Sequence, residues 1–294
     1  MNKQQVSKQY IVVTACKNEE ANLSDLIESM VSQTIRPALW VIVDDGSTDK
    51  TPEIIRGATK KHNWIQSIRL AVSRRDTGLH LTRILKEGFE FAIELSMRND
   101  IDYSYLSNID GDIILEPTFF EYLITEFEKD PKLGIASGGA KLIVGERIVH
   151  AKVRVDEPSG GHMLIRRRCF EDCGGILESS SWWDATLKRK AELRGWKNRR
   201  FEENKVTHKG EPIGADSYWK GYLEHGRRAY RFNTHPIHVM IKSTGYLFKK
   251  PYYIGIAYLL GYFRGFILRE EQIEDEEIRD YFWNKWKKIM EDKS

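Results

Sequence analysis

Cysteine is scarce in this sequence and the net charge is small, and each shortage excludes some kinds of protein. The 294 residues include three cysteines, so any disulfide pairing would leave one thiol over. Cys169 and Cys173 could ligate zinc, but no second Cys or His pair accompanies them at ligand spacing, and we expect buried thiols instead. A net charge of +3, from 46 basic and 43 acidic residues, gives no general attraction for nucleic acid.

Neither a secretory leader nor an uninterrupted membrane span is expected. Residues 1–5 lack the apolar core of a signal peptide, which together with the few cysteines favours a cytoplasmic protein. Residues 251–268 approach the length of a span, but Arg264 and three glycines interrupt them. Their tyrosines and basic flanks are typical of a helix lying on an anionic membrane surface, here the inner face of the membrane. Packing on the rest of the protein or on a second subunit, as in a homodimer, is the alternative.

Two kinds of segment alternate in the first part of the chain. Apolar, strand-like runs occur near residues 10–14, 39–43, 65–72 and 103–109. Between them, apolar residues recur at helical spacing near residues 19–33, 48–61 and 79–97. This alternation predicts an α/β fold with a mainly parallel sheet covered by helices on both faces. Further along we expect a helix after Pro117, strands at 134–139, 141–155 and 197–207, a helix ending near Gly195, and a charged, solvated terminal helix within 270–290.

The first two strands end in polar residues. Tyr10–Thr14 runs into Ala15–Asn18, and Val41–Val43 runs into Asp44–Asp49. A turn followed by a helix N-cap would also favour such residues. In open α/β sheets, however, ligands bind beyond the carboxyl ends of parallel strands, so two polar ends side by side predict a ligand site.

Two Asp-x-Asp pairs occur, and their settings differ. Asp100-Ile101-Asp102 precedes a strand, where a solvated loop is expected, whereas Asp110-Gly111-Asp112 follows one, on the side predicted for ligands. Two carboxylates separated by glycine can hold Mg²⁺ or Mn²⁺ while the ion keeps open positions. Such an ion would bridge a diphosphate and neutralise charge on a departing phosphate.

Four motifs together resemble the family 2 glycosyltransferases, whose fold is called GT-A. They are YIVVTACKNEEANL, VIVDDGSTDKT, NIDGDIILEP and WWDATLKRKAELRGWK. The resemblance covers about residues 9–210 and implies a Rossmann-like, mainly parallel sheet flanked by helices, with a helical C-terminal extension. It implies a catalytic domain over 1–210, with a nucleotide-sugar half at about 9–112 and an acceptor half at about 113–210, and a separate helical region over 211–294.

The resemblance assigns the donor site to the loops after the first two strands. It implies that Thr14 and Cys16 line the nucleoside pocket, that Asp45 hydrogen-bonds the base, and that Asp44 and Ser47 shape the loop. An ionised carboxylate suits the donor edge of uracil or guanine because it only accepts hydrogen bonds.

The resemblance assigns the remaining roles to five later residues. Arg75 would lie near the base or phosphates, although a solvated arginine is the alternative. Asp110 would face the ribose and the metal, Asp112 would bind the metal, and His208 would lie near metal and diphosphate. Asp184 would be the catalytic base, although helix capping is the alternative and Trp183 stands where the family commonly has Glu.

These assignments predict a metal-dependent inverting glycosyltransferase that uses Mn²⁺ or Mg²⁺. It would move one sugar from a nucleotide-diphosphate donor to a sugar or lipid-linked acceptor, such as a cell-surface polysaccharide precursor. Single addition is favoured because the Gln-x-x-Arg-Trp motif of processive synthases is missing after Asp184. A nucleotidyltransferase and a non-catalytic nucleotide-sugar-binding protein are the alternatives, and nucleic acid is not expected as a partner.

Overall fold

The computed structural model describes residues 7–71, 79–144, 147–150, 154–180, 182–209 and 218–291. The chain divides into two compact units, 1–210 and 211–294, each of which has its own packing.

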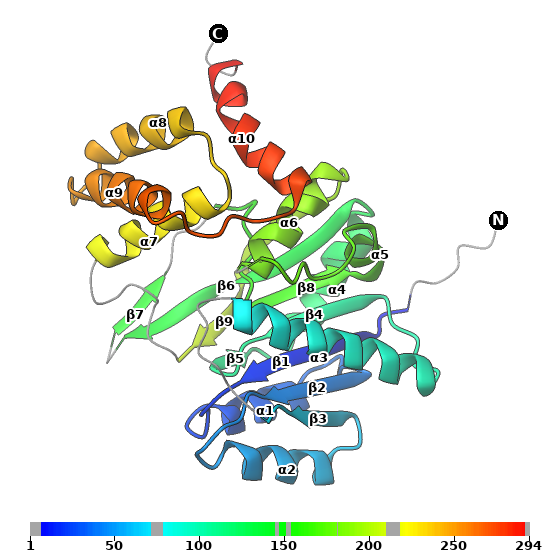
Figure 1. Ribbon diagram of the computed structural model, residues 1–294. Helices are drawn as coiled ribbons and strands as arrows, with labels where there is room; N and C mark the ends of the chain where they lie inside the picture. The colour runs from blue at the N-terminus through cyan, green and yellow to red at the C-terminus, as the bar shows by residue number, and fades with distance from the viewer. Residues whose placement is uncertain are drawn as a thin grey trace, which may run out of the picture. The chain divides into compact units, whose positions relative to one another are not determined.

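The first unit is built on a sheet whose first half is parallel (Figure 1). Its four strands pair in the order β3 (Ile65–Arg69), β2 (Leu39–Asp44), β1 (Tyr10–Cys16), β4 (Tyr105–Ile109). β1 and β2 are apolar runs buried along almost their whole length, whereas β3 contains polar residues and only Ile65 in it is buried. Cys16 is the register partner of Asp44, so the loops after β1 and β2 leave the sheet side by side.

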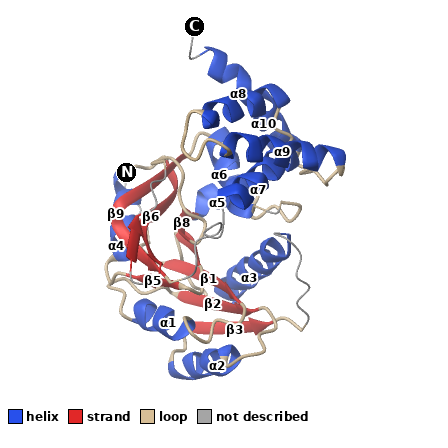
Figure 2. Cartoon of the chain, turned by 90° about the vertical axis from the view of Figure 1, so that its left-hand side faces the viewer, coloured by secondary structure: helices blue, strands red, loops and turns tan. Residues whose placement is uncertain are grey.

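Helices cover both faces of this sheet. One face is packed by α1 (Leu23–Val31), α2 (Thr51–Lys61) and α4 (Phe119–Lys129), and the other by α3 (Leu79–Arg98), α5 (Arg167–Asp172) and α6 (Trp183–Leu193). Figure 2 shows α1 and α3 on opposite sides of the strands. A Cβ on Gly88 would lie 2.6 Å from Val13 and 2.8 Å from Val43, so glycine lets α3 approach the sheet closely.

The second half of the sheet is mixed. The strand β8 (His162–Arg166) is antiparallel to β4, and β6 (Leu133–Val144) lies between β8 and β9 (Lys197–His208). The short strand β5 (Ile113–Leu115) pairs with the end of β9, and β7 (Arg147–His150) pairs with β6. Because Ile113 is the register partner of His208, the end of β9 lies beside the segment that follows β4.

The structure confirms the α/β fold with its helix-covered sheet and corrects several boundaries. The predicted strand at 65–72 ends at Arg69, and the predicted strands at 134–139 and 141–155 are one long strand, β6, followed by β7. The pairing of β6 with β9 shifts register between Gly138 and Gly139, close to the predicted break between the two strands. Residues 145–146 and 151–153, within the second prediction, lie outside the described residues. The elements β5, β8 and α5 were not predicted from the sequence.

The second unit consists of helices: α7 (Tyr218–Arg231), α8 (Pro236–Leu247), α9 (Ile254–Ile267) and α10 (Glu276–Glu291). The helices α7 and α9 cross closely, because a Cβ on Gly226 or Gly261 would overlap the main chain of the other helix. The prediction of a solvated helix from 270 was wrong at its start, since Glu270 is a partly buried ion-pair partner of Arg227 and Arg231 and α10 begins at Glu276. Within the described residues, no helix combines the length and apolarity needed to cross a bilayer.

Candidate functional site

The loops after β1 and β2 are tied together by hydrogen bonds. The Ser47 hydroxyl accepts from the main-chain N–H of Asn18 at 3.0 Å, and the Thr51 hydroxyl accepts from that of Glu19 at 2.8 Å. The carboxylate of Asp49 accepts from the main-chain N–H of Glu20 at 3.1 Å. Much of the hydroxyl-rich and acid-rich motif therefore satisfies the main chain of its own two loops.

Asp44 and Ser47 belong to this framework. Both are buried, and Asp44 Oδ1 accepts from the main-chain N–H of Ser47 at 2.9 Å. The Arg69 guanidinium lies 3.2 Å from the other oxygen of Asp44 and donates to the carbonyl of Ser47 at 2.8 Å. The structure thus places these two residues where they fix the shape of the loop.

Asp45 has a different environment from its neighbours. Its carboxylate is buried but faces two basic side chains, Lys17 at 3.5 Å and His80, whose Nε2 lies 2.9 and 3.0 Å from the two carboxylate oxygens. His80 comes from the first turn of α3, and the sequence carried no signal that set it apart from a solvated histidine. The predicted contact residue Arg75 lies outside the described residues.

Thr14 and Cys16 point into the sheet packing. The Thr14 hydroxyl is buried and accepts from the Trp40 indole N–H at 3.0 Å, while the Cys16 thiol donates to the carbonyl of Val43 at 3.6 Å. Burial and the nearby acids raise the pKa of Cys16 far above its usual value, so the thiol stays neutral. A role of these residues in a nucleoside pocket would fall to their main-chain atoms.

Asp110 lies at the end of β4 and is held from two sides. Asn108 donates both to Asp110 Oδ1 at 3.0 Å and to the carbonyl of Gly160 at 2.8 Å, and the Asp110 N–H donates to the carbonyl of Gly161 at 2.9 Å. Burial, reinforced by the carboxylates of Asp112 and Asp184, raises the pKa of Asp110 to about 6. A cation at this position would therefore stabilise the ionised form.

Asp112 is paired with His208. Its Oδ2 lies 3.4 Å from His208 Nε2, an approach set by the pairing of β5 with β9. Glu19 lies on the other side of the turn, because a Cβ on Gly111 would lie 3.0 Å from its Cγ. Burial raises the pKa of Glu19, and Asp112 adds to the shift. Several acids therefore gather around Gly111.

Asp184 and Asp110 lie against the same pair of glycines. A Cβ on Gly160 would lie 2.8 Å from the Cβ of Asp184, and one on Gly161 would overlap the carboxylate of Asp110. Asp184 stands in the first turn of α6, and Lys188, one turn later, lies 3.0 Å from its Oδ2. The glycine turn thus brings the predicted base to the end of the strand that carries Asp110. Lys188, Asn108 and Glu19 were not predicted as site residues.

Asp112 and His208 would supply part of the ligand shell of a hard divalent cation. Across the described segments of the chain, no group of three or more His, Cys, Asp or Glu side chains is arranged to hold a metal. Asp112 and His208 nevertheless offer one carboxylate and one imidazole at the same place. Mg²⁺ and Mn²⁺ are commonly held by one or two protein ligands, with substrate phosphates and water completing the shell, so the pair fits such an ion.

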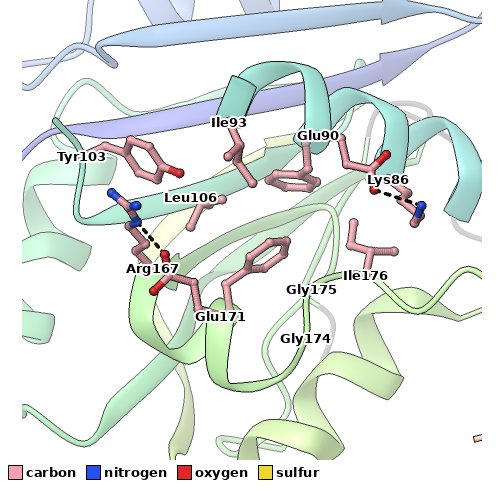
Figure 3. Close-up of a pocket in the computed structure, with 12 residues that line it drawn as sticks. Lys86, Glu90, Ile93, Tyr103, Leu106, Arg167, Glu171, Gly174, Gly175 and Ile176 are labelled. Atoms are coloured by element: carbon pink, nitrogen blue, oxygen red, sulfur yellow. Dashed lines mark hydrogen bonds and ion pairs between the residues drawn. The ribbon is translucent and has the colours of Figure 1, made fainter. Parts of the chain in front are cut away.

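A separate cavity of about 290 Å³ lies between α3, β4 and α5 (Figure 3). Its walls include Phe89, Phe170 and Ile176, and ion pairs between Lys86 and Glu90 and between Arg167 and Glu171 lie at its rim. None of the predicted site residues lines it, so the acidic site at the strand ends is distinct from this cavity.

Solved glycosyltransferases share this architecture. The S. aureus TarS fragment 1–349 in complex with UDP-GlcNAc gives a TM-score of 0.53 at 14% identity, covering 92% of this chain and 78% of that one. A mannosyltransferase from Pyrobaculum calidifontis, solved with GDP-Man and Mn²⁺, gives a TM-score of 0.52 at 15% identity, covering 85% of this chain and 69% of that one. The fold is therefore that of the GT-A glycosyltransferases.

Sequence comparison identifies the family. Residues 11–173 match glycosyl transferase family 2. The chain belongs to this family and is a glycosyltransferase. It is 25% identical over 207 residues to the poly-beta-1,6-N-acetyl-D-glucosamine synthase of Staphylococcus epidermidis and 26% identical over 202 residues to that of Staphylococcus aureus. These matches cover 64% and 62% of this chain but 45% of each relative, so the chain spans less than half the length of these relatives.

Proposed function

We propose that this protein is a metal-dependent, inverting glycosyltransferase that adds one sugar from a nucleotide-diphosphate donor to a hydroxyl of a glycan or lipid-linked acceptor. The observation that carries the proposal is the Gly160-Gly161 turn, against which both Asp110 and Asp184 pack. One carboxylate lies on the donor side of the fold and the other begins a helix of the acceptor side. In this proposal residues 1–210 are the catalytic domain, with its donor half at about 9–112 and its acceptor half at about 113–210.

The donor site would lie over the ends of β1 and β2. Asp44 and Ser47 hold the loop in shape, and Asp45 accepts a hydrogen bond from the base while Lys17 and His80 hold its carboxylate. A carboxylate has room for several donors, so the base and the imidazole can share it. UDP-GlcNAc is the first donor to test, because the similar synthases make an N-acetylglucosamine polymer and the TarS structure contains this molecule.

Asp112 and His208 would hold Mn²⁺ or Mg²⁺, and Asp110 would face the ribose and the ion. When bound, the ion supplies positive charge that offsets the charge of the leaving diphosphate. The raised pKa of Asp110, caused mainly by burial, agrees with a carboxylate placed to receive a cation.

Asp184 would act as the general base. Its carboxylate takes the proton from the acceptor hydroxyl as that oxygen attacks the anomeric carbon from the side opposite the diphosphate. The attack forms the new C–O bond while the bond to the phosphate oxygen breaks, and the configuration inverts. Family membership favours this reaction over nucleotidyl transfer, and a non-catalytic binding protein would not need Asp184.

The experiment is a screen of nucleotide sugars with Mn²⁺, in which mass spectrometry of candidate acceptors looks for the gain of one sugar. Asp112→Asn should remove activity, whereas the matched variant Asp102→Asn, in the exposed Asp-x-Asp pair before β4, should keep it. Equal activity of both variants would contradict the metal role. Addition of many sugars to one acceptor would contradict single transfer.

We also propose that the helical unit 211–294 binds the surface of an anionic membrane. Ile256, Leu260, Phe263 and Ile267 form a stripe on α9, on the face away from α7, with exposed fractions between 47% and 75%. Between Glu224 and Glu270 the sequence has no acidic residue and eight lysines and arginines. Apolar side chains beside basic ones are what an anionic bilayer surface attracts.

Sedimentation with vesicles tests the membrane proposal. Wild-type protein should bind phosphatidylglycerol vesicles at low salt more than phosphatidylcholine vesicles, and the double variant Leu260→Ser with Phe263→Ser should lose most of this binding. Met97→Ser is the matched control, since Met97 is an exposed apolar residue of the first unit. If the wild type binds neither vesicle, the stripe packs against protein instead, either the rest of this chain or a second copy.

A further inference from the structure

Lys188 is a buried lysine whose ammonium group points at the proposed catalytic base. The residue is 6% exposed, and its Nζ lies 3.0 Å from Asp184 Oδ2, 2.9 Å from the carbonyl oxygen of Pro158 and 3.6 Å from Glu157 Oε2. Asp184 and Lys188 are four residues apart, so their side chains lie on one face of α6. A buried ammonium group is costly unless it is paired and hydrogen-bonded, and here all three of its neighbours are acceptors.

The position of Lys188 links Asp184 to the glycine turn. Pro158, whose carbonyl Lys188 binds, comes two residues before Gly160, and Gly160 packs against Asp184. The same loop is held on its other side, where the Ser159 N–H donates to the Ser137 hydroxyl at 2.9 Å. Lys188 therefore fixes both the carboxylate and the loop that the carboxylate rests on.

A second cation, Arg189, follows Lys188 in the sequence and makes ion pairs with neighbouring glutamates. Arg189 forms ion pairs with both Glu157 and Glu192. Glu157 therefore keeps an ion-pair partner when Lys188 is lost, whereas the ion pair between Lys188 and Asp184 is lost with it. This division of contacts favours a role for Lys188 at the site over a role in folding alone.

We propose, resting on the proposed function, that Lys188 is a positioning residue that holds the ionised Asp184 carboxylate toward the acceptor hydroxyl. General-base catalysis needs the accepting oxygen within hydrogen-bond reach of the proton, and a displacement of about 1 Å can cost ~100-fold in rate. The contacts of Lys188 are with Asp184, Glu157 and Pro158, so its loss acts first on the base and reaches the donor site only through the glycine turn. The lysine thus affects kcat and not the donor KM.

The test compares Lys188→Met, Lys188→Gln and the control Lys190→Met, which removes a lysine from the same helix. UDP release from UDP-GlcNAc with Mn²⁺ is measured together with melting temperature. Both Lys188 variants should lower kcat by roughly 10- to 100-fold with an unchanged donor KM, and Lys190→Met should keep the wild-type values. Lys188→Gln keeps a hydrogen-bond donor for the Pro158 carbonyl, so it still provides a test if Lys188→Met fails to fold. A raised KM at wild-type kcat would overturn the proposal.

A double-mutant cycle separates this role from a structural one. In the Asp184→Asn background, Lys188→Gln should cause no further fall in kcat, because Lys188 acts through Asp184. An equal fall in both backgrounds would overturn the proposal. If Asp184→Asn is inactive but Lys188→Gln has the wild-type kcat, the positioning role of Lys188 is wrong while the base role of Asp184 stands. If Asp184→Asn has wild-type turnover, both roles are wrong.

Discussion

Asp112 and His208 lie far apart in the sequence, yet Oδ2 of Asp112 is 3.4 Å from Nε2 of His208. The pairing of β5 with β9 creates this contact, since Ile113 and His208 are register partners. A carboxylate and an imidazole together form part of a typical Mn²⁺ shell and leave positions for a diphosphate.

Removing the imidazole should therefore weaken metal-dependent binding of UDP. We expect His208→Ala to lower the Mn²⁺-dependent gain in UDP affinity by roughly 10-fold or more, the range found when groups supporting a metal site are lost. Calorimetric titration of UDP with and without Mn²⁺ measures this gain. An unchanged gain in the variant would show that His208 is not a ligand.

Asp45→Asn should weaken UDP binding without destabilising the fold. The amide keeps the size of the side chain but replaces one acceptor oxygen by a donor, which faces the base N–H. Loss of a buried hydrogen bond costs ~1–3 kcal/mol. Calorimetry gives the affinity and thermal melting gives the stability. An early-melting variant whose folded fraction binds UDP normally would assign Asp45 to loop structure alone.

Gly161→Ala should strongly reduce turnover, because its Cβ would overlap the Asp110 carboxylate. A displacement of about 1 Å at the site can lower the rate ~100-fold. Gly57→Ala in α2 is the control, since a Cβ there meets no described atom within 4 Å and alanine favours a helix. Turnover and melting temperature should be normal or improved in the control. Wild-type turnover of Gly161→Ala would mean that the turn does not position Asp110.

Acid should destabilise the protein through His162. Burial lowers the pKa of His162 from the ordinary 6.5 to about 3; the hydrogen bond to the Gly138 carbonyl opposes this shift, and the positive charges of Arg200 and His208 add to it. The unfolded chain takes up a proton below about 6.5 and the folded chain does not, so the free energy of unfolding falls as pH drops from about 6.5 to about 3, by about 1.4 kcal/mol per unit. In urea titrations at several pH values, His162→Gln should show a smaller slope. An equal slope would place the acid sensitivity elsewhere.

The strand and helix pattern was largely predictable because it depends on local apolar spacing. The runs at Tyr10–Cys16 and Leu39–Asp44 are buried on both faces, and such runs are typical of a parallel sheet. The strand His162–Arg166 was not predicted, because a short apolar segment directly after two glycines has the pattern of a turn. Its place between β4 and β6 depends on pairings that span long stretches of sequence.

Residues of the candidate site could be predicted only where they belong to a sequence motif. The acids at 110, 112 and 184 could be named from the sequence, whereas His80, Asn108 and Lys188 could not. Each of these three acts on an acid through a contact that the fold creates or orients, and their residue types are common on protein surfaces. Glu270 was mispredicted for the same reason: its charged segment suggested an exposed side chain, but the fold partly buries it between two arginines.

The proposal that Asp184 is the general base is tested most directly by measuring the turnover of Asp184→Asn together with its affinity for UDP in the presence of Mn²⁺. Asn retains the shape of the side chain, and the N-cap position of α6 is Trp182, not residue 184, so the variant should fold and bind UDP as the wild type does. Sugar transfer should fall ~10²–10⁴-fold, the usual contribution of a general base. Wild-type transfer in a folded, UDP-binding variant would contradict the account and would move the search for the base to another residue.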